Sequence, residues 1–324
     1  MDRAAWIAGK FGTFHHFLTA AETSPSAWNA QVDSFAVDLL ADQLAEAGVD
    51  WHVLTVGQNS GHYCAPNSAY AELTGRGALL SQRDLIADLA GALTRRGIRL
   101  LVYSTTMAPN RDGQAMERLG CTPPEDLARI LGLDPAVYRI QSGCADLARF
   151  RANWEAVHRT WSTTWDASIH GWWIDGCYAR TLFQGAELNF ASFGAALRTG
   201  NPAAIACWNP GVNSQVRPCG SDDDYTAGEW DTGMPVLVDQ PWCNRPGRLV
   251  DGIQAHTLGF LGSWWGAGAP RFPDTMIAGW TGVMARSGWA TTLDLPIDPR
   301  HGISTDYRRQ LAAIRHAVTG ARTA

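Results

Sequence analysis

The sequence predicts an α/β fold, and among such folds it favours a (β/α)8 barrel of the TIM type. Short runs rich in β-branched and aromatic residues alternate with amphipathic helical runs along most of the chain. Several of the strand-like runs are apolar on both faces, as buried parallel strands are. The 324 residues are 46% hydrophobic, with no change of composition that would divide them. We therefore expect residues 1–324 to form one domain.

Seven segments are expected to be strands, and an eighth strand is expected to lack a clear pattern. The seven segments are 10–17, 51–56, 98–105, 169–175, 203–209, 234–242 and 289–297. Each is rich in the residues that favour a pleated, half-buried surface. Because active sites of (β/α)8 barrels lie at the carboxyl ends of the strands, polar residues that follow these segments are the first functional candidates.

Three helices are expected from their start and stop signals. Residues 81–96 open with a capping-box-like S-x-x-D pattern, place leucines on one face and stop at Gly97. Residues 36–47 behave likewise and end before Gly48. A third helix is expected over about residues 144–165.

An acid ends one of the expected strands, in the stretch "GWWIDG" over residues 171–176. An ionised carboxylate is costly to bury unless hydrogen bonds or positive charge compensate it. Asp175 falls at the carboxyl end of the strand, where a barrel holds its active site. The sequence also allows a purely structural role, in which Asp175 caps the next helix or pairs with an arginine.

Charge and composition argue against several classes of partner. The net charge is −5, and the basic residues are scattered rather than clustered, so neither a nucleic acid nor a membrane is an expected partner. No segment approaches the length of a membrane-spanning helix, and the first residues lack the apolar core of a secretory signal. We therefore expect a cytoplasmic protein.

Several catalytic motifs are absent from the sequence. None of its nine histidines lies in H-E-x-x-H or a comparable cluster, so no metal site is expected. Neither a G-x-S-x-G elbow nor a phosphate-binding loop occurs, and "GAGAPRF" at 266–272 fails the dinucleotide pattern. No cofactor is expected.

Tryptophan is unusually frequent, with 15 residues in the chain. Several follow or end the expected strands, and an indole face can pack against the C–H face of a sugar ring. These are Trp173, Trp208, Trp230, Trp242, Trp264 and Trp265, and among them Trp173, Trp208 and Trp265 are candidates for stacking on a carbohydrate. Core packing is the simpler interpretation for any one of them.

Several stretches together resemble the α-L-fucosidases of glycoside hydrolase family 29. "WIAGKFGTFHHF" resembles the opening motif of that family and places His16 on its sugar-binding histidine. "GWWIDG" resembles the strand that carries the nucleophile, and the match falls on Asp175. "RPCGSDDDYTAGEWD" is similar to a later segment and places Arg217 on an arginine and Glu229 on the general acid/base. The resemblance covers most of residues 6–303.

The resemblance implies a retaining glycosidase. Asp175 would attack the anomeric carbon and Glu229 would protonate the leaving oxygen, with Arg217 orienting a carboxylate or a sugar hydroxyl. Three further acids, Asp222, Asp223 and Asp224, leave the identity of the acid/base open.

The sequence also departs from the pattern of that family. Where the family has K-H-H-D-G-F after strand 2, this chain reads Gly57-Gln58-Asn59-Ser60-Gly61-His62, so Gln58, Asn59 and His62 would join His16 in binding hydroxyls. The β-sandwich that follows the barrel in the family is not expected, since the chain ends about twenty residues after "HGI".

The expected partner is a carbohydrate substrate, a terminal α-L-fucoside or a related sugar. The alternatives are a glycosidase of the same build that is specific for another sugar, and a sugar-binding barrel without catalysis. Surface left bare by the missing sandwich would suit a homo-oligomer. The sequence does not distinguish exo from endo action.

Overall fold

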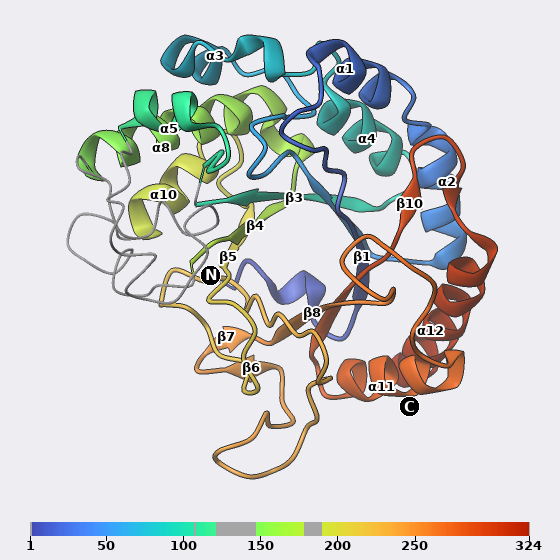
Figure 1. Cartoon of the computed structure of the whole chain (residues 1–324). Helices are drawn as coiled ribbons and strands as arrows, with labels where there is room; N and C mark the ends of the chain where they lie inside the picture. The colour runs from blue at the N-terminus through green and yellow to red at the C-terminus, as the bar shows by residue number, and fades with distance from the viewer. Residues whose placement is uncertain (1, 107, 121–146, 178–189, 324) are drawn as a thin grey trace.

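A curled sheet of seven parallel strands forms the centre of the computed structural model (Figure 1). The structure describes residues 2–106, 108–120, 147–177 and 190–323. The strands, in sheet order, are β5 (Ile205–Trp208), β4 (Gly171–Asp175), β3 (Arg99–Thr105), β2 (Trp51–Thr55), β1 (Phe11–His15), β9 (Ala290–Asp294) and β8 (His256–Phe260).

Helices surround this sheet on its outer side (Figure 1). They are α1 (Pro25–Asp33), α2 (Val37–Ala47), α3 (Ser68–Thr74), α4 (Leu85–Thr94), α5 (Gly113–Leu119), α8 (Leu147–Trp165), α10 (Phe190–Leu197), α11 (Asp274–Arg286) and α12 (Thr305–Thr323). The short elements are η1 (Ala5–Ile7), η2 (Gly77–Leu79), η3 (Asp166–Ser168), β6 (Leu249–Val250), β7 (Ile253–Gln254), β10 (Ile297–Asp298) and β11 (Gly302–Ile303). None of the helices in the described ranges is long and apolar enough to cross a membrane.

An irregular segment, residues 224–229, lies between the two edges of the sheet. The backbone N–H of Asp224 donates to the carbonyl of Ala206 on β5 at 2.9 Å. Glu229 forms an isolated parallel bridge with Leu258 on β8. The described residues therefore form a barrel-like α/β fold built on a seven-stranded sheet, and the predicted closed barrel of eight strands is not confirmed.

The predicted strands agree with the observed ones except in two places. Residues 234–242 form no strand; they hold two prolines and expose Val236 and Trp242 by 69% and 71%. The strand that the sequence failed to indicate is β8, which contains Gly259. A Cβ atom there would lie 2.1 Å from the Trp230 ring, so close packing explains the glycine that weakens the strand pattern.

The predicted helices are observed with shifted ends. Helix α4 begins after Asp84, whose side chain accepts a hydrogen bond from the Ala87 N–H at 2.9 Å, so Asp84 rather than Ser81 is the N-cap. Helix α2 ends at Gly48, which has a φ of 67°. Helix α8 begins at Leu147 within the described residues.

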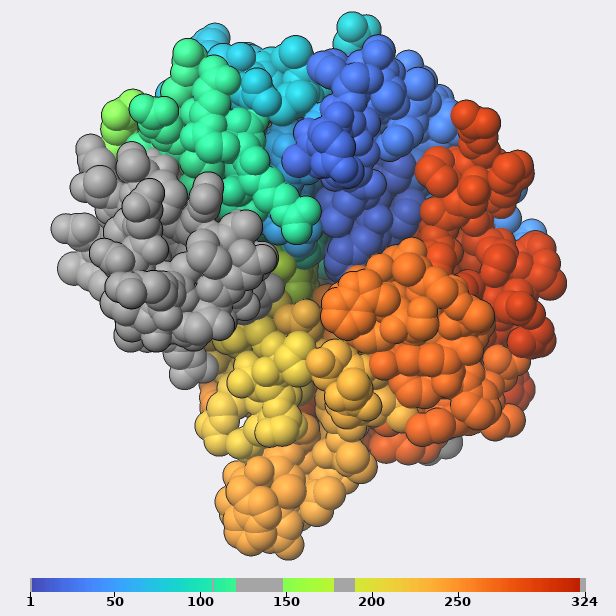
Figure 2. Space-filling view, in the orientation of Figure 1, coloured from blue at the N-terminus to red at the C-terminus, as the bar shows by residue number. Residues whose placement is uncertain are grey.

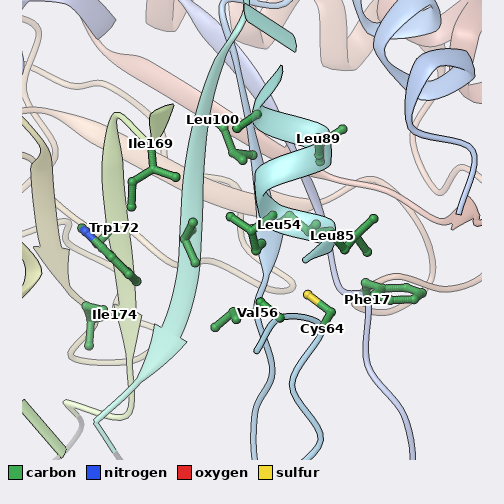
Figure 3. Close-up of a cluster of buried hydrophobic side chains, with 14 of the residues drawn as sticks. Phe17, Leu54, Val56, Cys64, Leu85, Leu89, Leu100, Ile169, Trp172 and Ile174 are labelled. Atoms are coloured by element: carbon green, nitrogen blue, oxygen red, sulfur yellow. The ribbon is translucent and has the colours of Figure 1, made fainter. Parts of the chain in front are cut away.

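Alternate residues of the strands face two different cores. Outward side chains such as Trp172 and Ile174 of β4 belong to one buried cluster with Leu54 and with Leu85 and Leu89 of α4 (Figure 3). Inward side chains, Trp173 among them, form a second cluster inside the curled sheet. Asp175 follows the same alternation and therefore also points inward.

The N-terminal segment closes the end of the sheet where the strands begin. The Trp6 ring meets Trp51, the first residue of β2, edge to face at 6.0 Å. The guanidinium of Arg99, the first residue of β3, lies 4.1 Å from the Trp6 ring. A ligand can therefore approach the inward side chains from the carboxyl ends of the strands.

Candidate active site

A pocket of about 410 Å³ opens at the carboxyl ends of the strands. Its walls are formed by Phe14, His16, Leu18, Gln58, Tyr103, Trp173, Asp175, Glu229, Leu258, Trp264, Trp265 and Gly266. The space-filling view is hollowed near its centre, where blue, yellow and orange parts of the chain meet (Figure 2). We call this the central pocket.

The carboxylate of Asp175 accepts three hydrogen bonds. The Tyr103 hydroxyl donates to Oδ2 at 2.7 Å. The Gly176 N–H and the Asn209 side-chain amide donate to Oδ1 at 2.7 Å and 2.9 Å. Donors therefore bond both oxygens, which compensates the burial of a side chain that is only 8% exposed. Asp175 thus has the hydrogen bonding of a carboxylate held ready to act as an anion.

The amide of Asn209 joins the two candidate carboxylates. Its Nδ2 donates to Asp175 at 2.9 Å and to Oε2 of Glu229 at 2.7 Å. The two acceptor oxygens can therefore be no farther apart than these two bonds laid end to end. Asn209 follows β5, whereas Glu229 lies beside β8, so the fold brings acids from distant parts of the sequence to one point.

Glu229 has a pKa well above its ordinary value. Burial and, to a smaller extent, the negative charge of Asp175 together raise the pKa of Glu229 to about 7, although the bond from Asn209 lowers it. A carboxyl group with such a pKa carries a proton through much of the neutral range. The pair therefore combines an acceptor-only carboxylate with a carboxylic acid that can give up a proton.

Two consecutive hydrogen bonds, from Gln58 to Tyr103 and from Tyr103 to Asp175, hold the Asp175 carboxylate in place. The Gln58 amide donates to the Tyr103 hydroxyl at 2.5 Å, and Tyr103 donates in turn to Asp175. Burial and the charge of Asp175 raise the pKa of Tyr103 well above its usual value, so the hydroxyl keeps its proton. The Tyr103 ring stacks on Trp173 at 5.4 Å, which fixes its orientation.

A buried acid, Asp294, orients His16 in the wall of the pocket. Asp294, at the end of β9, is fully buried; one oxygen contacts His16 Nδ1 at 2.7 Å and the other accepts the Gly266 N–H at 2.6 Å. A carboxylate at Nδ1 favours the tautomer that has its proton there, which leaves Nε2 available as an acceptor when the ring is neutral. The Trp265 ring lies 5.3 Å from His16.

Six of the residues singled out from the sequence meet in the central pocket. They are Asp175, Glu229, His16, Gln58, Trp173 and Trp265. Asn59 and His62 do not line it. The backbone carbonyl of Asn59 accepts the backbone N–H of Arg111, and His62 Nε2 contacts the carbonyl of Thr23 at 2.9 Å.

Arg217 lies outside the pocket, which corrects the sequence-based assignment. It is half-exposed, donates to Gln215 and lies 3.8 Å from Asp251. The loop that follows β5 carries it away from the carboxyl ends of the strands. Among the described residues that line the pocket there is no arginine or lysine, and Asn209 takes the place expected for a positive charge.

Trp208 also lies outside the pocket. Its ring is fully buried on the helix side of the sheet, stacked on Phe190 of α10 at 4.5 Å. Strand pairing explains this, since Trp208 lies beside Ile174 and both point outward.

We predict that Trp208→Ala lowers the free energy of unfolding by about 3–5 kcal/mol, because it removes a fully buried indole and leaves a cavity. Urea unfolding followed by fluorescence measures this. The matched control is Trp264→Ala, since Trp264 is 61% exposed at the pocket rim and its loss is expected to change stability by less than about 0.5 kcal/mol. Equal losses in the two variants would contradict the assignment of Trp208 to the core.

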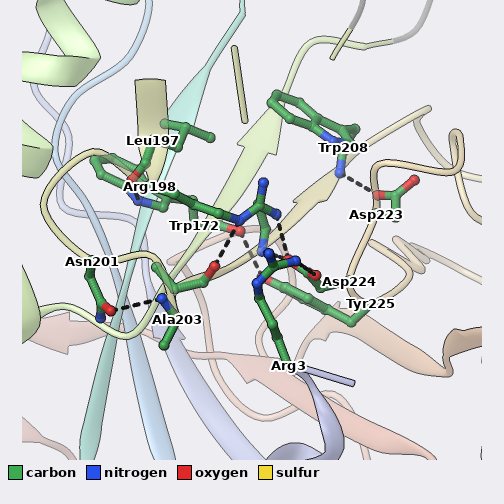
Figure 4. A network of polar contacts seen from close by, with 12 residues as sticks. Arg3, Trp172, Leu197, Arg198, Asn201, Ala203, Trp208, Asp223, Asp224 and Tyr225 are labelled. Carbon is green, nitrogen blue, oxygen red and sulfur yellow. Dashed lines mark hydrogen bonds and ion pairs between the residues drawn. The ribbon is translucent and has the colours of Figure 1, made fainter. Parts of the chain in front are cut away.

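The acids that precede Glu229 have structural partners. Asp223 accepts the backbone N–H groups of Trp208 and Gly220, each at 2.8 Å, and Asp224 pairs with Arg198 at 2.5 Å (Figure 4). Neither they nor Asp222 line the central pocket. Burial raises the pKa of Asp223 to about 7, although it lies away from Asp175.

Three residues of the site or its support were not predicted from the sequence: Tyr103, Asn209 and Asp294. Each lies in the last residues of a strand or directly after it, which was the available signal. No group of three or more metal-ligating side chains occurs among the described residues.

The fold defined by this sheet and pocket is one that solved glycoside hydrolase structures also have. No family model and no curated protein matches the sequence. Among solved structures, "Endo-fucoidan hydrolase P5AFcnA from glycoside hydrolase family 107" aligns with a TM-score of 0.71 at 13% identity, over 98% of this chain and 94% of that one. A second endo-fucoidan hydrolase, MfFcnA4, aligns at 0.69 and 17% identity, over 98% of this chain and 53% of that one.

An α-L-fucosidase structure has the same fold. Alpha-L-fucosidase isoenzyme 1 from Paenibacillus thiaminolyticus aligns with a TM-score of 0.63 at 15% identity, over 99% of this chain and 76% of that one. At such identities the likeness establishes the fold and leaves the chemistry to the residues of the pocket.

Proposed function

We propose that this chain is a retaining glycoside hydrolase that cleaves a terminal α-L-fucoside or a related sugar through a covalent glycosyl-enzyme. The observation that carries the proposal is the single amide of Asn209 that bonds both Asp175 and Glu229 inside one pocket. The named activities of the solved structures with this fold support the same class of substrate.

Asp175 is the nucleophile in this proposal. Three hydrogen bonds hold its carboxylate in place, and it lines the pocket where a sugar ring would sit. Its attack on the anomeric carbon forms the ester bond of the intermediate while the glycosidic bond breaks.

Glu229 is the acid/base. Its raised pKa keeps a proton available for the departing oxygen, and the same group later removes a proton from the attacking water. Carboxyl groups of retaining enzymes stand about 5 to 5.5 Å apart, against about 6.5 to 9.5 Å in inverting ones. The oxygens of Asp175 and Glu229 bonded to Asn209 are close enough for the retaining arrangement.

The walls suit a small sugar with an apolar face. Trp173 and Trp265 supply aromatic surface, and His16 and Gln58 supply polar atoms. Hydrolysis of a panel of 4-nitrophenyl glycosides tests the function, with the α-L-fucoside expected to react. Gln58, in place of a histidine of the family, favours the alternative of a related sugar, which would appear as a different preferred glycoside. Binding without hydrolysis of any member would leave the non-catalytic sugar-binding barrel.

Removal of the bridging amide should disturb both carboxylates. In Asn209→Ala, we expect kcat/KM to fall about 10- to 100-fold, since a hydrogen bond to a charged group contributes about 1.5–3 kcal/mol. The pKa of Glu229 should rise, because the bond from Asn209 lowers it, so the basic limb of the pH profile should move to higher pH. The matched control is Asn213→Ala, an exposed amide of the same loop. An unmoved limb in Asn209→Ala would contradict the bridging role.

A further inference from the structure

A second hollow adjoins the central pocket. It has a volume of about 530 Å³ and shares three wall residues with the pocket: His16, Leu18 and Gly266. Gly266 has a φ of +62°, and a Cβ atom at this position would lie 3.1 Å from the Cβ of His16. The missing side chain therefore leaves room at the junction between the two hollows.

The outer part of this hollow is polar. Gln31 and Ser34, in and just after α1, line one side, and Arg300 and His301, between β10 and β11, line another. The backbone between those two strands is held in place by Asp298, which accepts the N–H groups of Arg300 and His301 at 2.8 Å and 2.9 Å.

We propose that this hollow is a second sugar subsite, which binds the saccharide unit next to the one held at Asp175. The inference rests on the proposed glycosidase function and extends it, because it makes the preferred substrate an oligosaccharide. A sugar unit offers hydroxyls to donors and acceptors on every edge, and Gln31, Ser34, Arg300 and His301 supply both kinds. His16 lines both hollows and contacts the bound saccharide where it passes from one hollow to the other.

The test compares a short and a long probe. The short probe is 4-nitrophenyl α-L-fucoside and the long one is an α-L-fuco-tetrasaccharide labelled at its reducing end. The double variant Gln31→Ala/Arg300→Ala removes two exposed side chains of the hollow and is matched by Arg308→Ala, an exposed arginine outside it. We expect kcat/KM for the tetrasaccharide to fall about 10-fold in the double variant, and kcat/KM for the aryl fucoside to change less than about twofold.

The outcomes separate the subsite from the catalytic proposal. Equal effects on both probes, or no effect on the tetrasaccharide, overturn the subsite while leaving the hydrolase intact. If neither probe is hydrolysed, the proposed function fails, and calorimetric binding of the tetrasaccharide still decides the subsite. Binding that is weakened about 10-fold in the double variant supports it, whereas absent or unchanged binding overturns it.

Discussion

Asp175→Ala is expected to lower kcat/KM for an aryl fucoside by about 10⁴-fold or more, as removal of a group that acts only in the transition state does. The substitution removes only the side chain, and Tyr103, one of the donors that bonded it, lines a pocket that water can enter. Circular dichroism should therefore show a folded protein, which distinguishes a catalytic loss from unfolding.

Azide distinguishes the nucleophile from the acid/base. In Asp175→Ala the anion can occupy the vacated space and attack the anomeric carbon directly, which gives a glycosyl azide of inverted configuration. In Glu229→Ala the ester to Asp175 still forms, and azide then displaces it to give the retained configuration. Proton NMR determines the anomeric configuration of the two products and so tests both assignments. A glycosyl azide of retained configuration from Asp175→Ala would contradict the role of Asp175 as nucleophile, as would activity within tenfold of the unaltered protein.

The strand pattern alone determined much of the site. Because side chains alternate across a strand, an inward Trp173 requires an inward Asp175, and the carboxyl end of the strand places it where barrels hold their active sites. The face on which Trp208 lies follows instead from its pairing with the outward Ile174, which only the structure shows.

Other parts of the site depend on contacts between strands that a sequence does not display. Asn209 follows its strand like many loop residues, and its role appears only when β4, β5 and the segment 224–229 lie side by side. The prediction that Arg217 lies in the site differs from the structure for a related reason. Its position depends on a loop without regular structure, where spacing from a motif does not fix direction.

The hydrogen-bond donors around the two acids explain why one pocket can hold both. Two carboxylates this close repel each other when both are charged, and the pair is stable with one proton between them. Within the described residues, Asp175 has three donors and Glu229 has the amide of Asn209, which agrees with the raised pKa of Glu229. The number of donors thus supports the proposed roles without reference to any family.

Glu229→Gln should remove the basic limb of the pH profile. General acid catalysis needs the protonated group, so kcat/KM of the unaltered protein should fall tenfold per pH unit above about pH 7, where burial has raised the pKa of Glu229. For a fucoside with a poor leaving group, loss of the acid should cost about 10²–10⁴-fold. For a 2,4-dinitrophenyl fucoside, which needs no proton to depart, the rate of formation of the glycosyl-enzyme should be nearly kept and should no longer fall above pH 7.

The same substitution should change stability with a defined sign. The pKa of Glu229 is higher in the folded protein than its ordinary value of 4.5, so the folded state binds the proton more tightly. Its contribution to stability is therefore present below about pH 4.5 and is lost as pH rises towards 7. Glu229→Gln should be more stable than the unaltered protein at pH 8, by about 1–3 kcal/mol in urea unfolding.

Asp223→Asn supplies the control that the basic limb requires. Burial gives Asp223 a pKa of about 7 as well, so either acid could produce a limb near neutral pH. Asp223 accepts the backbone of Trp208 and Gly220 and lies outside the pocket, so its replacement should lower stability and leave the limb in place. If the limb disappears in Asp223→Asn and persists in Glu229→Gln, the proton donor is not Glu229. If the basic limb disappears only in Glu229→Gln, the proton donor is Glu229, one of the two acids that Asn209 bonds.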